Sequence, residues 1–225
     1  MQTLQTSTGM LILSALLTLS WSHFSFAQGM KRTGSSEFGF RLNYVEDETY
    51  SGPNGSYLKI DGDMGFGFNY MYNTSEHWSF GGSFDWVNLD YRAHAEPEDP
   101  ADDPFDYRNR MYNYSLNFDT IYHLFDSNIT PYVTGSLGWT SIDTNVATGP
   151  GYEYCWWDWW GYYCSTVVPT KRKNGFNYKV GAGMRWDVNR SFTVRGSVSY
   201  SELDINIAGQ NPENTIWRIE LVSRM

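Results

Sequence analysis

Residues 57–72 alternate strictly between two kinds of side chain, and this pattern restricts the possible fold more than any other feature. Successive side chains of a β-strand point to opposite faces, so a two-residue period gives one apolar and one polar face. Aromatic residues make up 18% of the chain although its mean hydropathy is only −0.49. Strands in which every second residue is apolar account for both values. One parity holds Leu58, Ile60, Met64, Phe66, Phe68, Tyr70 and Tyr72, and the other holds Lys59, Asp61, Asp63, Gly65, Gly67, Asn69 and Met71.

The same period recurs along the chain, and we predict eight antiparallel strands from it. The connections alternate between short turns and long loops, and the long ones fall at 47–56, 92–108, 143–173 and 201–214. Short periplasmic turns and longer extracellular loops are typical of outer-membrane barrels. The sequence therefore predicts an all-β fold, an eight-stranded antiparallel up-and-down transmembrane β-barrel with both termini in the periplasm. The predicted strands are 36–46, 57–72, 78–91, 109–123, 130–142, 174–187, 191–201 and the segment from 215.

Alternation alone does not say which face is outside, because a secreted lipocalin-like barrel turns its apolar face inward. Two observations favour the membrane version. The polar parity is rich in Gly, Ser and Asn, which suit a narrow lumen. Tyr and Trp also gather at the strand ends, as interfacial girdles require. These rings are Tyr44, Tyr57, Tyr72, Trp78, Trp86, Tyr122, Trp139, Trp186 and Trp217.

The N-terminus has the pattern of an export signal. An apolar run covers residues 10–19, and Ser25-Phe26-Ala27 is a small-x-small cleavage pattern. We expect a signal peptide over 1–27 and a barrel domain over 28–225; a membrane-anchoring helix is the alternative. No stretch of about 18 apolar residues follows, so no later helix is expected to span a membrane.

Net charge and cysteine content exclude several classes of function. The net charge of −9 and pI near 4.8 argue against nucleic acid as a partner. Cys155 and Cys164 are the only cysteines, and their closeness favours an intraloop disulfide in an exported protein. Neither has a second Cys or a His nearby, so a metal site is not expected, and no cofactor is predicted.

Two stretches, 130–139 and 180–186, carry a family resemblance, and the second continues into Asn189-Arg190-Ser191-Phe192. Here the chain resembles the small Gram-negative outer-membrane barrels of the OmpA/OmpX and OmpW type. The resemblance implies residence in the cell outer membrane, contact with outer-membrane lipid and lipopolysaccharide, and insertion by the barrel-insertion machinery. Such barrels usually end in Phe or Trp, whereas this chain ends in Met225. The family does not specify an activity.

The inward parity gathers charged side chains. An eight-stranded barrel is just wide enough for side chains to fill it, so charges there must pair. The network is either a structural plug or the lining of a narrow, gated pore for small solutes. OmpW-type relatives are associated with an apolar passage, and a polar interior argues against transferring that idea. The predicted lumen charges are Arg41, Lys59, Asp61, Asp63, Asp85, Asp119, Lys179, Arg185, Arg195, Arg218 and Glu220.

The segment between the two cysteines packs six aromatic residues into the longest predicted loop. Trp and Tyr dominate binding hot spots, so a rigid loop of this kind predicts a surface recognition site for an unknown extracellular ligand. The alternative is a loop that folds over the barrel mouth and buries its own rings. The residues concerned are Trp156, Trp157, Trp159, Trp160, Tyr162 and Tyr163.

Enzymes exist on small outer-membrane barrels, and they need a His beside a Ser or a carboxylate near the outer leaflet. His77 and His123 are predicted on the periplasmic side, and only His94 outside. We therefore expect a non-enzymatic barrel with a mostly closed polar interior. It would act in envelope structure or surface interaction through its loops; a porin-like channel for small solutes is the alternative.

Overall fold

The computed structural model describes residues 31–96, 103–205 and 211–225. The predicted signal peptide, 1–27, lies outside these residues. Within the described part, no helix has the length and apolar character needed to cross a membrane.

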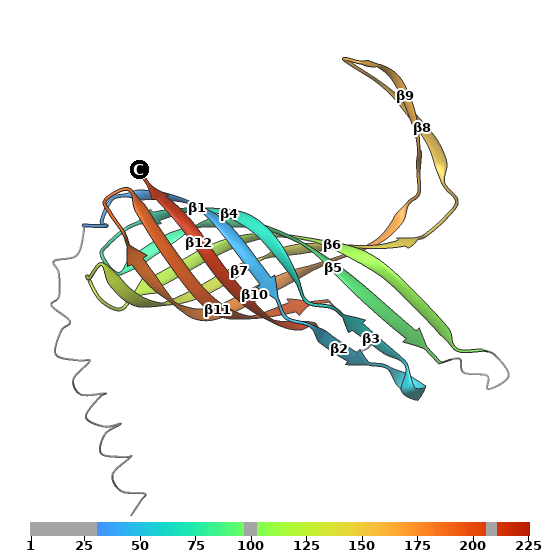
Figure 1. Ribbon diagram of the computed structural model, residues 1–225, viewed down its shortest axis with the longest axis horizontal. Coiled ribbons are helices and arrows are strands. Elements are labelled where there is room, and N and C mark those ends of the chain that lie inside the picture. Colours follow the sequence, from blue (N-terminus) through green and yellow to red (C-terminus); the bar gives the residue numbers. More distant parts are fainter. Residues whose placement is uncertain (1–30, 97–102, 206–210) are drawn as a thin grey trace, which may run out of the picture.

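Eight strands close into a ring, which confirms the predicted barrel (Figure 1). Every strand is antiparallel to its neighbours, and the first and last strands of the ring pair with each other, for example Phe38 with Ser223. The ring consists of β1 (Ser36–Val45), β4 (Asp63–Asn73), β5 (Trp78–Ala95), β6 (Phe105–His123), β7 (Ile129–Ala147), β10 (Thr170–Asp187), β11 (Phe192–Asp204) and β12 (Glu213–Arg224).

The two ends of the barrel differ. Short turns join β4 to β5, β6 to β7 and β10 to β11 at one end, where Met225 also exchanges backbone hydrogen bonds with Ser36. We call this the short-turn end and the opposite one the long-loop end. Two predicted loops at the long-loop end form hairpins. One consists of β2 (Glu48–Ser51) and β3 (Tyr57–Ile60), joined through the turn Pro53–Gly55, and the other of β8 (Tyr152–Asp158) and β9 (Gly161–Val167).

The prediction of one continuous strand over 57–72 is wrong. The segment divides into β3, which pairs with the outer part of β5, and β4, which belongs to the ring. Gly62 lies at the break, where a Cβ atom would come within 2.7 Å of the Val45 carbonyl oxygen. Both segments run antiparallel to β5, but the register shifts by one residue between the pairs Ile60–Tyr91 and Gly65–Val87, so the parity reverses. Ile60 points inward and is buried, whereas Phe66 points outward and is exposed.

Within the ring, apolar side chains face outward and polar side chains face inward. On β4, Phe66, Phe68 and Tyr70 are exposed, whereas Gly67 and Asn69 between them are buried. This arrangement is the reverse of a lipocalin-like barrel, whose apolar face would be inside. The lumen is so narrow that a Cβ atom at the inward-facing Gly138 would collide with the Leu116 carbonyl and the Asn117 side chain.

The sequence predicts a polar interior, but the interior is not polar along its whole length. At the long-loop end the inward side chains form a buried apolar cluster, which we call the apolar collar. It includes a residue of β3, because the parity reverses at Gly62. The collar consists of Val45, Tyr50, Ile60, Leu89, Tyr91, Met111, Ile142, Leu203, Ile205 and Ile216.

Candidate functional sites: the charged lumen and the aromatic hairpin

Arg41 lies at the centre of the lumen. Its guanidinium contacts Asp119 at 2.7 Å, Glu220 at 2.9 Å and Asp85 at 3.8 Å. These four residues come from β1, β6, β12 and β5, so strands from around the ring converge on one cation. All four were predicted to face the lumen, and all four are buried.

Asp85 forms a second meeting point nearer the apolar collar. Lys179 approaches its carboxylate at 3.5 Å and Arg218 at 3.7 Å. The side-chain amides of Asn43 and Asn117 donate to it at 3.0 and 3.3 Å. A buried carboxylate needs this many partners because desolvation of a lone charge is costly.

A third cluster lies toward the short-turn end. Arg185, fully buried, donates to both oxygens of Glu37 at 2.6 and 3.0 Å and contacts Asp187 at 2.8 Å. Arg195 joins this cluster to the central one, because it approaches Glu37 at 3.7 Å and Glu220 at 2.7 Å. Arg224 contacts Asp187 at 3.0 Å.

Carboxylates are shared throughout this network. Glu37, Asp85, Asp187 and Glu220 each lie within 4.0 Å of three cationic side chains. Glu37, Asp187 and Arg224 were absent from the predicted set, although each shares the inward parity of its strand.

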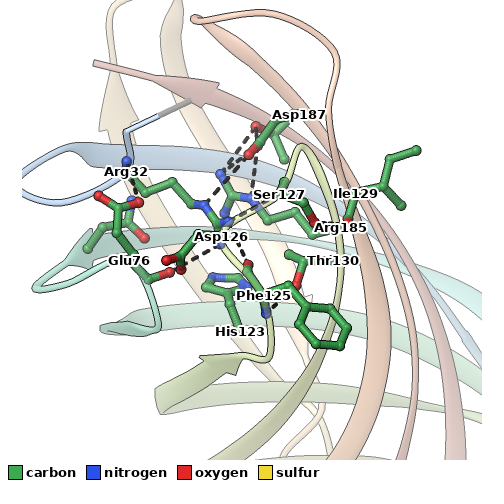
Figure 2. A network of polar contacts seen from close by, with 12 residues as sticks. Arg32, Glu76, His123, Phe125, Asp126, Ser127, Ile129, Thr130, Arg185 and Asp187 are labelled. Atoms are coloured by element: carbon green, nitrogen blue, oxygen red, sulfur yellow. Dashed lines mark hydrogen bonds and ion pairs between the residues drawn. The ribbon is translucent and has the colours of Figure 1, made fainter. Parts of the chain in front are cut away.

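The short-turn end is plugged by Arg32, which precedes β1 (Figure 2). Its side chain is fully buried and lies 3.7 Å from Asp187. The guanidinium donates to the carbonyl oxygens of Phe125 at 2.9 Å, Ser127 at 3.2 Å and Glu76 at 3.2 Å. No alternation extends this far toward the N-terminus, so the sequence carried no signal for this contact.

The Glu76 side chain fixes the arm that carries Arg32. The backbone N–H of Arg32 donates to it at 3.0 Å, and the Thr33 hydroxyl donates at 2.7 Å. We call residues 31–35 the N-terminal arm. The arm is thus tied to the turns that follow β4 and β6.

Three predicted lumen charges lie elsewhere. Lys59 and Asp61 are on the outside near the long-loop end, where Asp61 pairs with Arg92 at 3.0 Å. Asp63 is exposed and accepts a hydrogen bond from the Met64 backbone N–H. For Lys59 and Asp61 the prediction was wrong because it assumed that one parity continued through Gly62. Asp63 shares the inward parity of β4, but it is the first residue after the break and is exposed.

A small cavity of ≈ 60 Å³ separates the charged layers from the apolar collar. Lys179, Arg218 and Asp85 lie on one side, and Val45, Leu89 and Ile216 on the other. A polar cavity of this size has room for ordered water.

Cys155 and Cys164 are disulfide-bonded, as predicted. They pair directly across the β8–β9 hairpin, and Trp159 and Trp160 form its turn. The next residue, Gly161, has φ 139°, a conformation that L-residues with side chains rarely adopt. The disulfide and this turn hold the aromatic residues of the hairpin in a fixed ribbon.

Aromatic side chains cover both faces and the tip of the hairpin. Tyr154 stacks on Trp156 along one face, with ring centroids 5.9 Å apart. Trp157 stands opposite Tyr162 on the other face, beside the disulfide. Trp157, Trp159 and Trp160 are 76%, 98% and 86% exposed. Tyr162 and Tyr163 are exposed as well.

Two groupings that resemble catalytic or metal sites do not have the required chemistry. Glu153 lies near Cys155 and Cys164, but the disulfide uses both sulfurs. Ser79 lies 3.3 Å from His123, and the Ser79 hydroxyl donates its proton to Asn73. A serine that gives its proton to an amide is not activated by the histidine.

Comparison with known proteins settles the family. The profile described as "Outer membrane protein beta-barrel domain" matches residues 11–224. The chain belongs to this family. Outer-membrane barrels have their short turns in the periplasm and their longer loops outside the cell, and we assign the two ends of this barrel accordingly.

Solved barrels with similar folds include OprG of Pseudomonas aeruginosa. It has a TM-score of 0.57 and 12% identity, and the match covers 88% of this chain and 98% of that one. Ail of Yersinia pestis, solved with the heparin analogue sucrose octasulfate, has a TM-score of 0.47 and 16% identity over 87% of this chain and 100% of that one. Neisserial surface protein A has a TM-score of 0.45 and 12% identity over 84% and 96%. At these identities the likeness concerns the fold alone. No match was found among curated proteins.

Proposed function

We propose that this outer-membrane barrel is a non-enzymatic surface-interaction protein. In this proposal the sealed barrel is the anchor and the β8–β9 hairpin is the part that binds at the outer surface of the cell. The observation that carries it is the exposure of Trp157, Trp159 and Trp160 on a disulfide-closed ribbon outside the barrel. Contiguous exposed apolar surface of this kind marks interaction sites.

The interior supports the role of anchor rather than that of channel. Three barriers lie in series: Arg32 at the periplasmic end, the ion-pair clusters around Arg185 and Arg41, and the apolar collar. A continuous water path would have to separate buried ion pairs, and the remaining charges would then lack partners.

Conductance in planar bilayers tests the closed interior. We expect wild-type protein to give no steady current, and at most brief small events. The double variant Arg32→Ala/Arg185→Ala removes the first barrier and the Arg185 part of the second, and Lys59→Ala is its matched control on the outer surface. Reproducible single-channel currents from wild-type protein, with ion selectivity altered by Asp119→Lys, would overturn the proposal in favour of a small-solute channel.

Retention of producing cells on coated surfaces tests the role of the hairpin. Immobilised phospholipid, polysaccharide and protein serve as probes. The variant Trp157→Ser/Trp159→Ser/Trp160→Ser should lose the retention that wild-type cells show, while Phe105→Ser, which removes another exposed extracellular ring, should keep it. Equal retention of both variants on every surface would exclude binding of the hairpin to any surface other than its own membrane.

A further inference from the structure

The β8–β9 hairpin has features that point to its partner, and this inference rests on the function proposed above. We infer that the hairpin binds the lipid bilayer, with its aromatic tip in the headgroup–acyl boundary of the outer leaflet that surrounds the barrel. The inference follows from how the rings are distributed, from the backbone of the ribbon, and from its position beside the barrel.

Aromatic rings surround the ribbon instead of forming one docking face. Tyr154 and Trp156 lie on one side, Trp157 and Tyr162 on the other, and Trp159 at the tip. A folded partner that covered one face would leave the rings of the opposite face in water. A lipid interface can enclose a thin ribbon from all sides, so it covers every ring at once.

The chemistry of the ribbon limits how deep it can go. β8 and β9 form a two-stranded sheet, so the outer edge of each strand has unpaired backbone groups. Such groups are not tolerated in hydrocarbon, where no water can satisfy them. Trp and Tyr favour the interface because their rings are apolar and their N–H and O–H groups need hydrogen-bond partners. At this boundary the aromatic rings reach an apolar environment, while their N–H and O–H groups and the backbone groups of the strand edges still find hydrogen-bond partners.

The position of the hairpin favours the membrane of its own barrel. Figure 1 shows the hairpin leaving the barrel wall sideways, and its tip curves back toward the barrel. Three basic residues, Lys171, Arg172 and Lys173, follow the hairpin and are exposed. Arg172 pairs with Asp143 at 3.0 Å, whereas no ion pair of Lys171 or Lys173 occurs within the described part of the chain. These lysines suit anionic headgroups, which attract basic residues near a membrane surface.

Tryptophan fluorescence of the full-length protein in lipid nanodiscs tests the inference. The hairpin signal is obtained as the difference between wild type and a variant with Trp156, Trp157, Trp159 and Trp160 all changed to Phe. In nanodiscs with bromine-labelled lipids, we expect quenching of this signal by labels near the headgroups, together with protection from aqueous iodide. The same protein in a lipid-free amphipathic polymer should show full iodide quenching. The control is the difference in fluorescence between wild type and Trp78→Phe, which reports on a ring that faces the barrel exterior.

The possible outcomes are separable. Equal iodide quenching in nanodiscs and polymer would overturn the inference. Quenching only by separate brominated vesicles added to unlabelled nanodiscs would also overturn it, because the target would then be an apposed membrane. A hairpin signal that responds to dissolved polysaccharide and not to lipid would assign the partner to carbohydrate. Either of the last two results would leave the proposed surface function standing. The proposed function itself would fail if the hairpin signal responded to neither lipid nor polysaccharide and the hairpin variant were retained as well as wild type on every surface.

Discussion

Arg32 donates a hydrogen bond to the carbonyl oxygen of Phe125 at 2.9 Å, across 93 positions of the chain. The contact joins the N-terminal arm to the periplasmic turn between β6 and β7. The guanidinium is fully buried. If it were removed, its carbonyl and carboxylate partners would therefore have no water to take over its hydrogen bonds.

Replacing Arg32 should therefore destabilise the barrel. We expect Arg32→Ala to lower the free energy of unfolding by about 1–3 kcal/mol, since buried acceptors lose their donor. The measurement is urea-induced unfolding in detergent, with Lys31→Ala, an exposed neighbour, as control. Equal midpoints for the two variants would show that the arm contributes nothing to stability.

Two arginines of β10 allow a direct test of burial. Arg185 and Arg172 both pair with aspartates, but Arg185 is fully buried and the Arg172 side chain is 70% exposed. Arg185→Met should cost about 3–5 kcal/mol because it removes from a buried network the cation nearest to both Glu37 and Asp187, whereas Arg172→Met should cost about 0–1 kcal/mol. Unfolding midpoints of both variants decide this, and similar losses would contradict a buried network.

The N-terminal arm should detach at low pH. Burial alone raises the pKa of the Glu76 carboxyl, but hydrogen bonds from Arg32 and Thr33 outweigh it, so the pKa lies below its ordinary value of 4.5. A lowered pKa in the folded state stabilises the fold above the ordinary value, and this contribution disappears as pH falls through the folded-state pKa. Limited proteolysis of the arm should therefore increase in acid. Glu76→Gln should abolish the pH dependence, and Glu153→Gln should retain it.

His94 should show the opposite sign at the extracellular end. Hydrogen bonds first with Asp106, at 2.9 Å, and then with Glu96 raise its pKa above 6.5. A raised pKa stabilises the fold below the ordinary value, and this contribution is lost as pH rises through the folded-state pKa. NMR titration of the imidazole should give a value above 6.5 that falls in Asp106→Asn. Asp103→Asn is the matched control, and an unchanged titration in Asp106→Asn would contradict the contact.

Removing the disulfide should loosen the hairpin without unfolding the barrel. Closure of so short a loop stabilises by roughly 2–3 kcal/mol, and β8 and β9 form a sheet separate from the ring. We expect Cys155→Ser/Cys164→Ser to make the hairpin sensitive to protease while the unfolding midpoint of the barrel stays unchanged. A lowered barrel midpoint would reveal packing of the hairpin on the ring.

Strand parity was sufficient to predict the ring and most of the lumen charges. It succeeded for Arg41 and Asp119 because each lies well inside a continuous strand. It failed at Lys59 and Asp61 because the register shifts at Gly62, and alternation carries no information across such a break. The apolar collar was detectable in part, since the inward parity of β1 ends in Val45 and Ile216 lies on the inward parity of β12.

Other features had no local signal. Arg32 precedes the first strand, and its partners Phe125 and Asp187 come from distant turns and strands. Only the closed barrel brings these residues together. No single segment of the sequence could therefore predict that Arg32 plugs the short-turn end. The partners of Asp85 illustrate the same limit, because parity predicts that a side chain faces the lumen but not which opposite strand it meets.

The pairing of β1 with β12 makes β12 decisive for biogenesis. Until Ile216 to Arg224 are synthesised and delivered, β1 and β11 each have an open hydrogen-bonding edge. Open edges are excluded from hydrocarbon, so a chain truncated before β12 has two such edges and cannot rest in the bilayer as a shortened barrel. Quality control of this protein therefore depends on β12, and a nonsense mutation just before this strand should be as damaging as one far upstream of it.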